Sequence, residues 1–555
     1  MQAQDGELLQ AVTQALQQDL RYEQIRQQAK AYAIDSEDPI SQLETSIFQH
    51  LLTSGGATFI SNTAYAATEQ LQQSYQAVPC IGPASVEALD SCGKDRHLHL
   101  RGLPADSLQK AKQAWQKLLV ERLYYLQAKL DLPLVQPRKC KAGVQQDTPG
   151  GSTEPASVRI ADREQPYLAH VPLLQDSHLF GVADWYSLVT TLLNSHWDTI
   201  SSAATQTLEA VNKANPTTRQ ELGSDWMSWG WLQGFFQGLR AQHRQVGLDD
   251  MLHAWFQQSS IQTGEACLEA GVIPRCRSAL QTGAPPALRP RLWAAALALH
   301  LPQASVETRF QGLCSQVEEC HLLTDLLIEQ DLETVANSEH FFLFEESLRA
   351  VLLAVSRDSE LGASCCHKPF PTLLARTEAG NTRGPYPPSG LLPCRGLVEY
   401  AAPLCYLFAD QASCAVLFCS MYARFWCRLH TIDDTAGKHA TLISLCVLFL
   451  HLLEESEGEV AQHLRGLGCP PLHLALPWIM TAFAGHLAVG EVLLLWDRIL
   501  GFDSLLPLPL LAVAVVAFRR QVLLSAESKE QVMSIMEDLS QLKTVPLIQG
   551  ILFGR

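Results

Sequence analysis

The chain has 555 residues, of which 47% are hydrophobic and 18% charged, and these proportions exclude a chain that is disordered throughout. The 41 lysines and arginines stand against 57 aspartates and glutamates, so the formal net charge is −16. Such a balance argues against a nucleic-acid binder, which needs a basic surface to displace counterions from phosphate.

The first 137 residues are expected to form a helical region. Large apolar side chains recur there every three or four residues, which predicts one long amphipathic helix. This stripe consists of Ala111, Trp115, Leu119, Leu123, Leu126 and Leu130. Asp106 or Ser107 is the expected N-cap, because short polar side chains accept the free N–H groups at a helix start.

Residues 138–165 are expected to be a linker or long loop, because glycine, proline, serine and threonine crowd the stretch 148–155. Residues 166–260 should form a second helical region that is rich in aromatic residues. Its densest part contains Trp226, Trp229, Trp231, Phe235 and Phe236. Two interpretations stand, a platform for a ligand or helices held together by buried rings, and the second is favoured.

The second half continues as helix, with one irregular insert at 362–393. Six prolines and four glycines there exclude a single helix, and such long loops are functional or disordered. The apolar stretch 505–518 is too short to cross a membrane and contains Pro507 and Pro509, so it should be a buried helix. The first twenty residues lack a secretory pattern. We therefore expect an all-α protein that is soluble, cytoplasmic and without a transmembrane segment.

Several motifs of small-molecule chemistry are missing from the sequence. None of the 16 cysteines forms a C-x-x-C pair, and no H-E-x-x-H follows, so no metal site is expected. The sequence also lacks a phosphate-binding G-x-x-x-x-G-K-[ST] and a G-x-S-x-G nucleophile motif. We therefore expect no cofactor and no metabolic enzyme.

Three runs in the second half share one pattern. Residues 283–293 read G-A-P-P-A-L-R-P-R-L-W, residues 476–483 read L-P-W-I-M-T-A-F, and residues 493–500 read L-L-L-W-D-R-I-L. In this order and spacing they resemble the TBC (Tre-2/Bub2/Cdc16) domain, the helical domain of Rab GTPase-activating proteins. The resemblance implies a TBC domain at 279–510 that includes the insert 362–393, followed by a helical tail at 511–555.

The resemblance assigns the motif residues to the scaffold of the domain. These residues are Arg289, Trp293, Asp331, Gly396, Trp478, Trp496 and Asp497. Arg289 and Trp293 are four residues apart and should share a helix face. Asp497 lies in a leucine-rich helix, where a carboxylate is costly without a partner, and Arg289 is one candidate for that partner.

The family supplies two side chains to the GTPase, an arginine that neutralises transition-state charge and a glutamine that orients water. Such an arginine is worth about 10³–10⁵ in rate. It comes from I-x-x-D-x-x-R, and the matching run here has Ile328 and Asp331 but Thr334 at the arginine position. The hydroxyl of Thr334 has no charge and cannot replace a guanidinium.

The family glutamine comes from Y-x-Q-G, and the matching run here is Pro393-Cys394-Arg395-Gly396. Arg395 therefore stands at the glutamine position, so both catalytic positions are substituted.

Three interpretations follow from these substitutions. The chain binds a Rab without accelerating hydrolysis, or another arginine replaces the missing one, or the chain is a helical scaffold for another protein. Arg395 is the first candidate for a replacement, and Arg357, Arg376 and Arg383 are the others. The resemblance implies a Rab-type partner that itself holds GTP and Mg²⁺, a role in vesicle trafficking, and a peripheral membrane location through the Rab.

Overall fold

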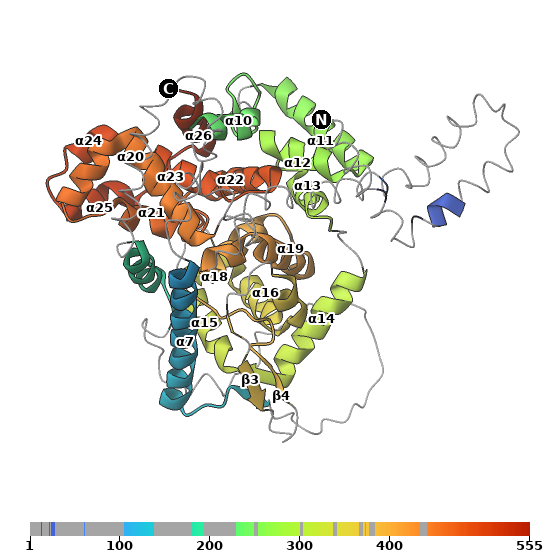
Figure 1. Cartoon of the computed structure of the whole chain (residues 1–555). Coiled ribbons are helices and arrows are strands. Elements are labelled where there is room, and N and C mark those ends of the chain that lie inside the picture. The colour runs from blue at the N-terminus through green and yellow to red at the C-terminus, as the bar shows by residue number, and fades with distance from the viewer. Residues whose placement is uncertain are drawn as a thin grey trace, which may run out of the picture.

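The computed structural model describes residues 105–137, 179–193, 229–248, 253–299, 304–336, 341–365, 370–371, 373–376, 383–432 and 441–554, with a few positions before residue 61. Helices dominate these segments, and the only strands among them form two short antiparallel pairs. The expected all-α class is confirmed (Figure 1). The linker expected at 138–165 lies outside the described residues.

The first elements lead from the N-terminal region into the second half. In chain order they are α7 (Ala105–Leu130), β1 (Val135–Pro137), α10 (Trp229–Phe235), η3 (Gln237–Leu239), α11 (Ala254–Ala270), α12 (Ile273–Thr282), α13 (Arg289–Ala296), α14 (Ala304–Glu319), β2 (Cys320–Leu322) and α15 (Leu323–Ala336). A further helix spans residues 182–193. Strand β1 pairs with β2, so the N-terminal region is joined to the start of α15.

The remaining elements complete the helical body. They are η4 (Phe342–Phe344), α16 (Glu345–Arg357), α17 (Ser359–Ser364), β3 (Leu373–Arg376), β4 (Arg383–Tyr386), α18 (Leu397–Ala401), η5 (Ala402–Tyr406), α19 (Gln411–Arg424), η6 (Trp426–His430), α20 (Leu442–Gly466), α21 (Pro471–Met480), α22 (Val489–Phe502), α23 (Pro507–Phe518), α24 (Arg520–Leu524), α25 (Lys529–Glu537) and α26 (Thr544–Phe553). Figure 1 shows α14–α19 in a lower group and α20–α26 with α10–α13 in an upper one.

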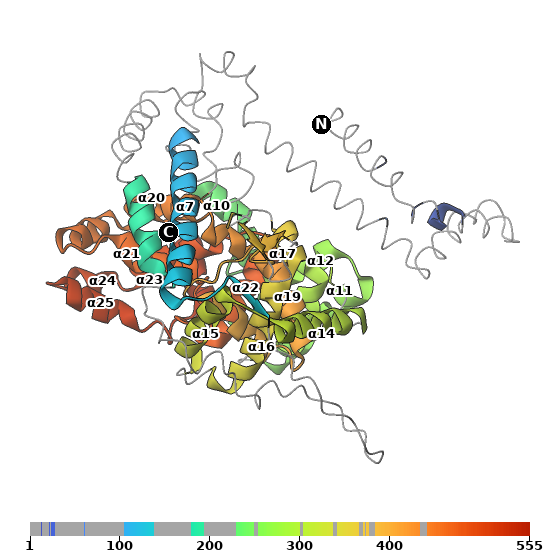
Figure 2. The ribbon, with the colours of Figure 1, turned by 90° about the horizontal axis from the view of Figure 1, so that it is seen from below.

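Helix α7 confirms the long helix predicted from the apolar stripe. Trp115, Leu119, Leu123 and Leu126 are all buried, which is the face that the spacing predicted. The helix begins at Ala105, so Asp106 and Ser107 lie inside its first turn and the predicted N-cap is wrong. Seen from below, α7 and the helix of residues 182–193 lie side by side against the body (Figure 2).

The helix predicted around residues 505–518 is confirmed as α23, and its residues from Pro507 to Val516 are buried. Among the residues that the structure describes, no helix is both long and apolar enough to span a bilayer. The expected domain boundary at 510 falls within α23, which therefore runs from the TBC-like part into the tail.

The aromatic segment packs in part as the favoured interpretation predicted, because Phe236 is buried whereas Phe235 is exposed. Phe235 and Phe236 contact Phe502 of α22, at ring-centroid distances of 5.8 and 4.8 Å. Trp231 stacks on Phe235. Trp226 lies outside the described residues. In the insert, strands β3 and β4 pair with each other, so it is not a single helix.

Candidate functional site

Asp331 joins the two sequence runs that carry the candidate site. Its Oδ1 accepts the backbone N–H of Gly396 at 2.8 Å, and its Oδ2 accepts that of Val398 at 2.8 Å. The carboxylate thereby caps the start of α18 and fixes its position against α15. Gly396 adopts φ +90°, a left-handed conformation that favours glycine. The loop before α18 and the C-terminal half of α15 therefore form one site.

Asp331 is buried, with an exposed fraction of 1%. Burial raises the pKa of Asp331 to about 6, although the N–H groups of Val398 and Gly396 and the charge of Arg395 oppose this rise. The carboxyl group is thus mostly ionised at neutral pH.

Thr334 lies one helical turn after Asp331, and its side chain is exposed. Its hydroxyl donates to the backbone carbonyl of Asp331 at 2.6 Å. This bond turns the side chain back on its own helix, an arrangement common for threonine. The residue that the sequence analysis assigned to the arginine position therefore presents no charge here.

Arg395 is exposed and precedes Gly396 in the loop. Its backbone N–H donates to the carbonyl of Phe180 at 2.6 Å, so the N-terminal region holds the loop from the other side. Its guanidinium is the cation that the sequence analysis predicted as a substitute for the missing arginine.

The other three arginine candidates differ from Arg395. Arg357 is 3% exposed and donates to the carboxylate of Asp325, with one Nη2–Oδ2 distance of 2.7 Å. It also donates to the carbonyl of Cys320 at 2.8 Å. The interpretation that Arg357 supplies charge to a partner is therefore wrong, because the group is buried and paired with Asp325. Arg376 and Arg383 face each other across the β3–β4 pair, and their side chains lie outside the described residues.

The predicted pairing of Arg289 with Asp497 is confirmed. Asp497 is fully buried and accepts from Arg289 Nε at 3.1 Å and from Arg289 Nη2 at 3.1 Å. It also accepts from Trp293 Nε1 at 2.6 Å and from the backbone N–H of Ala284 at 3.0 Å. One carboxylate thus ties α13 to α22, and four donors compensate its burial.

The two other tryptophans of the motif runs pack in the core. Trp496 is fully buried and donates through Nε1 to the carbonyl of Ala482 at 3.0 Å. Trp478 is buried and stacks on Phe483 at 6.1 Å. Both contacts agree with the scaffold role that the resemblance implied.

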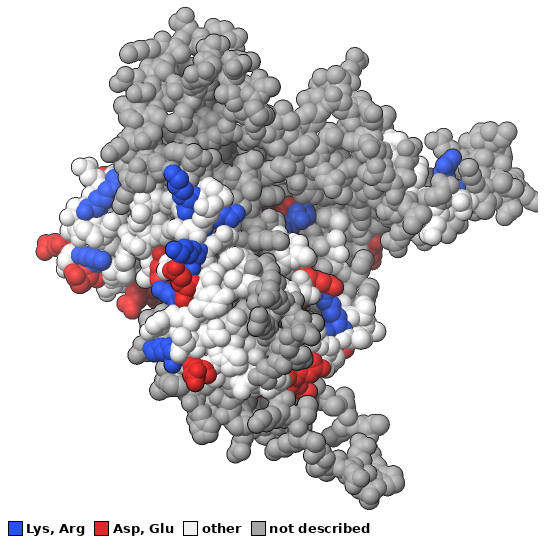
Figure 3. Space-filling view, turned by 60° about the horizontal axis from the view of Figure 1, so that its bottom comes forward, with Lys and Arg blue, Asp and Glu red and all other residues white. Residues whose placement is uncertain are grey.

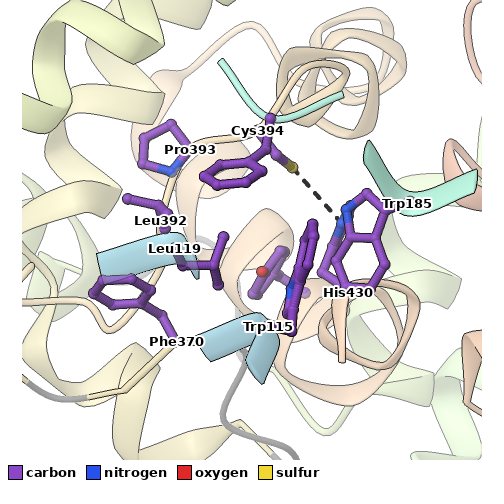
Figure 4. Close-up of a pocket in the computed structure, with 10 residues that line it drawn as sticks. Trp115, Leu119, Trp185, Phe370, Leu392, Pro393, Cys394 and His430 are labelled. Carbon is purple, nitrogen blue, oxygen red and sulfur yellow. Dashed lines mark hydrogen bonds between the residues drawn. The ribbon is translucent and has the colours of Figure 1, made fainter. Parts of the chain in front are cut away.

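The sequence reasoning missed the residues that lie behind the loop of Arg395. Cys394 Sγ lies 3.7 Å from His430 Nδ1, and His430 Nε2 lies 3.1 Å from the hydroxyl of Tyr400. Burial lowers the pKa of His430 to about 4, so the ring is neutral. A cavity of about 30 Å³ lies beside Cys394 and His430, and Trp115 and Trp185 also line it (Figure 4). No motif or spacing in the sequence signalled this contact.

Figure 3 shows one face of the molecule, on which basic and acidic side chains alternate where the residues are described. Within those same segments, no cluster of three or more histidine, cysteine or carboxylate side chains could hold a metal ion.

Comparisons with known proteins agree with the motif runs. Residues 394–524 match the family model of the Rab-GTPase-TBC domain. The chain is 28% identical over 551 residues to TBC1 domain family member 19 of Homo sapiens, which covers 98% of this chain and 97% of that protein. It is also 30% identical over 130 residues to the TBC domain-containing protein kinase-like protein of Dictyostelium discoideum, or 23% of this chain and 12% of that one.

Two solved structures are also similar. The Chlamydomonas flagellar RabGAP TBC domain aligns with 50% of this chain and 82% of its own, at 14% identity and a TM-score of 0.36. The Ypt/Rab-GAP domain of Gyp1p aligns with 50% of this chain and 89% of its own, at 12% identity and a TM-score of 0.35.

Proposed function

We propose that the chain regulates a Rab-type small GTPase through the site around Asp331, because residues 394–524 match the family model of the Rab-GTPase-TBC domain. In this proposal Arg395 supplies the positive charge that Thr334 lacks. The partner holds GTP and Mg²⁺, and this chain contributes no cofactor. Binding to a Rab would also place the chain at the membrane surface that the Rab occupies.

One observation carries the proposal. The carboxylate of Asp331 binds the N–H groups of Gly396 and Val398, and this places the loop of Arg395 beside the last turns of α15. Both family positions, now Thr334 and Arg395, are exposed. A partner that docks here meets the guanidinium of Arg395 and the side chain of Thr334.

The chemistry needs a cation next to the transferred phosphoryl group. A guanidinium there neutralises transition-state charge, and such an arginine contributes about 10³–10⁵ in rate, or roughly 4–7 kcal/mol. Arg395 occupies the family's glutamine position, so water must be oriented by another group. In other GTPase systems the GTPase itself supplies a glutamine for this purpose.

A second function is favoured by the geometry of Thr334. Because its hydroxyl is bonded to the carbonyl of Asp331, the arginine position of the family contributes nothing to charge stabilisation. The chain would then bind a Rab, or another protein partner, without accelerating hydrolysis.

Binding to Rab proteins loaded with GDP and aluminium fluoride separates these functions. An activator binds this transition-state mimic more tightly than the GDP form, because its charge matches the transition state. We expect that preference for wild type and its loss in Arg395→Ala, with Arg291→Ala, an exposed arginine on α13, as the matched control. Equal binding to both forms would contradict activation and support a binder or scaffold.

A further inference from the structure

We infer that the region before the TBC domain is part of the site, with Arg122 and Asp184 as positioning residues for the loop of Arg395. The segment Phe180–Gly181 touches the loop, and the ion pair between Arg122 and Asp184 holds that segment in place. This inference rests on the proposed function for what Arg395 does, but not for how its loop is held.

A backbone contact joins the N-terminal region to the loop of Arg395. Phe180 and Cys394 form a parallel β-bridge, and the N–H of Arg395 donates to the carbonyl of Phe180 at 2.6 Å. A Cβ on Gly181 would lie 3.8 Å from both Cβ and Cδ of Arg395, which is van der Waals contact. The segment thus lies directly against the first half of the Arg395 side chain.

An ion pair between Arg122 and Asp184 holds the segment Phe180–Gly181 in place. Arg122 of α7 binds Asp184 at both nitrogens, with Nη2–Oδ1 at 3.0 Å and Nη1–Oδ2 at 3.3 Å. Asp184 Oδ2 also accepts the N–H of Gly181 at 3.0 Å, so the same carboxylate caps the helix of residues 182–193. The guanidinium of Arg122 lies 4.0 Å from the ring centroid of Phe180. Two-point pairing of this kind fixes orientation as well as distance.

Aromatic rings pack behind the loop of Arg395. Trp115 of α7 contacts Phe180 and Trp185 at centroid distances of 5.3 and 4.5 Å. Trp185 in turn lies 6.2 Å from the ring of His430, which contacts Cys394 of the loop (Figure 4). The N-terminal region therefore supports the loop over a buried surface.

These contacts fix the backbone at Arg395 from two sides. The carbonyl of Phe180 accepts the N–H of Arg395, and the carboxylate of Asp331 accepts the N–H of the next residue, Gly396. A group that acts on a transition state gains from such support, because a misplaced side chain loses most of its effect. Arg122 and Asp184 act through Phe180 and Gly181, so a change in them should alter Arg395 without removing it.

The test uses the full chain and two kinds of measurement. Asp184→Asn keeps the volume of the side chain but loses the charge, and Glu121→Gln, an exposed neighbour of Arg122 on α7, is the control. Hydrogen exchange of the Arg395 amide should be about tenfold faster in Asp184→Asn and unchanged in the control. Arg122→Lys keeps the charge but loses the two-point geometry and should give a smaller increase, and it serves if Asp184→Asn does not fold.

The second measurement is the affinity ratio between Rab bound to GDP with aluminium fluoride and Rab bound to GDP. We expect Asp184→Asn to lower this ratio towards that of Arg395→Ala while the affinity for the GDP form stays unchanged. A general loss of stability would lower both affinities together.

Unchanged exchange at Arg395 in both variants would overturn the inference, whatever the Rab measurements give. Faster exchange with an unaltered affinity ratio would also overturn it, because the loop would then be held without positioning Arg395. If wild type itself prefers neither Rab form, the proposed function fails, and the exchange result alone decides whether this region holds the loop.

Discussion

The carboxylate of Asp331 binds the backbone N–H of Gly396 at 2.8 Å, although 65 residues separate the two in the sequence. Its second oxygen accepts the N–H of Val398, so both oxygens of this buried carboxylate accept a backbone hydrogen bond. The relationship explains why the loop of Arg395 and the last turns of α15 lie together. It also makes the position of the loop depend in part on an ionised group, beside the backbone contact with Phe180.

Asp331→Asn should weaken this connection. An asparagine accepts with only one oxygen, and its NH₂ group would face the second backbone N–H. We expect the free energy of unfolding to fall by about 1–3 kcal/mol, as for a buried hydrogen bond that loses its acceptor. Urea denaturation at pH 8, where Asp331 is ionised, measures this, with the exposed Asp131→Asn as control. Equal stability of both variants would show that the two N–H groups find other acceptors.

Asp497→Asn should destabilise the protein more strongly. The change leaves Arg289 buried and charged without its partner, and breaking such a pair costs about 3–5 kcal/mol. Glu454→Gln is the comparison, because Glu454 pairs with Arg465 at the surface and exposed pairs are worth about 0–1 kcal/mol. Chemical denaturation of both variants gives the difference. Similar losses for both would contradict the account of Asp497 as the tie between α13 and α22.

Thr334→Arg should restore the charge that the family places at this position. Thr334 is exposed and lies on a helix, where arginine is well tolerated. If the site faces the nucleotide of a bound Rab, the variant should accelerate GTP hydrolysis beyond wild type, towards the roughly 10³-fold effect of an arginine finger. Glu333→Arg, one residue earlier and also exposed, should not. Acceleration by both variants would indicate a general charge effect instead.

Glu399 should make stability depend on pH. Burial and the nearby charge of Asp331 raise the pKa of Glu399 to about 7, and its Oε2 has no hydrogen-bond partner among the described residues. Because the folded state binds this proton more tightly than the unfolded state, the stabilisation is present below about pH 4.5 and is lost as the pH rises through 7. Glu399→Gln should therefore gain stability over wild type at pH 8 relative to pH 5.

The expected gain is on the order of 2 kcal/mol at pH 8. Thermal unfolding at both pH values measures it, with the exposed Glu346→Gln as control. An equal difference between Glu399→Gln and wild type at the two pH values would mean that Glu399 titrates as an ordinary carboxyl group.

Parts of this structure could be predicted because they follow from local patterns. The apolar spacing around Trp115 predicted α7, and the cost of a buried carboxylate pointed to the partner of Asp497. Pairing between distant segments could not be predicted from the sequence. Phe180 meets Cys394 through a single β-bridge, which leaves no periodicity in either segment. The burial of Arg357 likewise depends on Asp325 of another helix, so the sequence presented it as a free candidate.

Single-turnover GTP hydrolysis across a panel of Rab proteins, with wild type and Arg395→Ala measured side by side, shows whether Arg395 acts on the transition state. We expect that wild type accelerates hydrolysis by at least one Rab and that Arg395→Ala loses this acceleration. Acceleration that persists in Arg395→Ala would contradict the role of Arg395. No acceleration of any Rab by wild type would contradict activation and leave the chain as a binder.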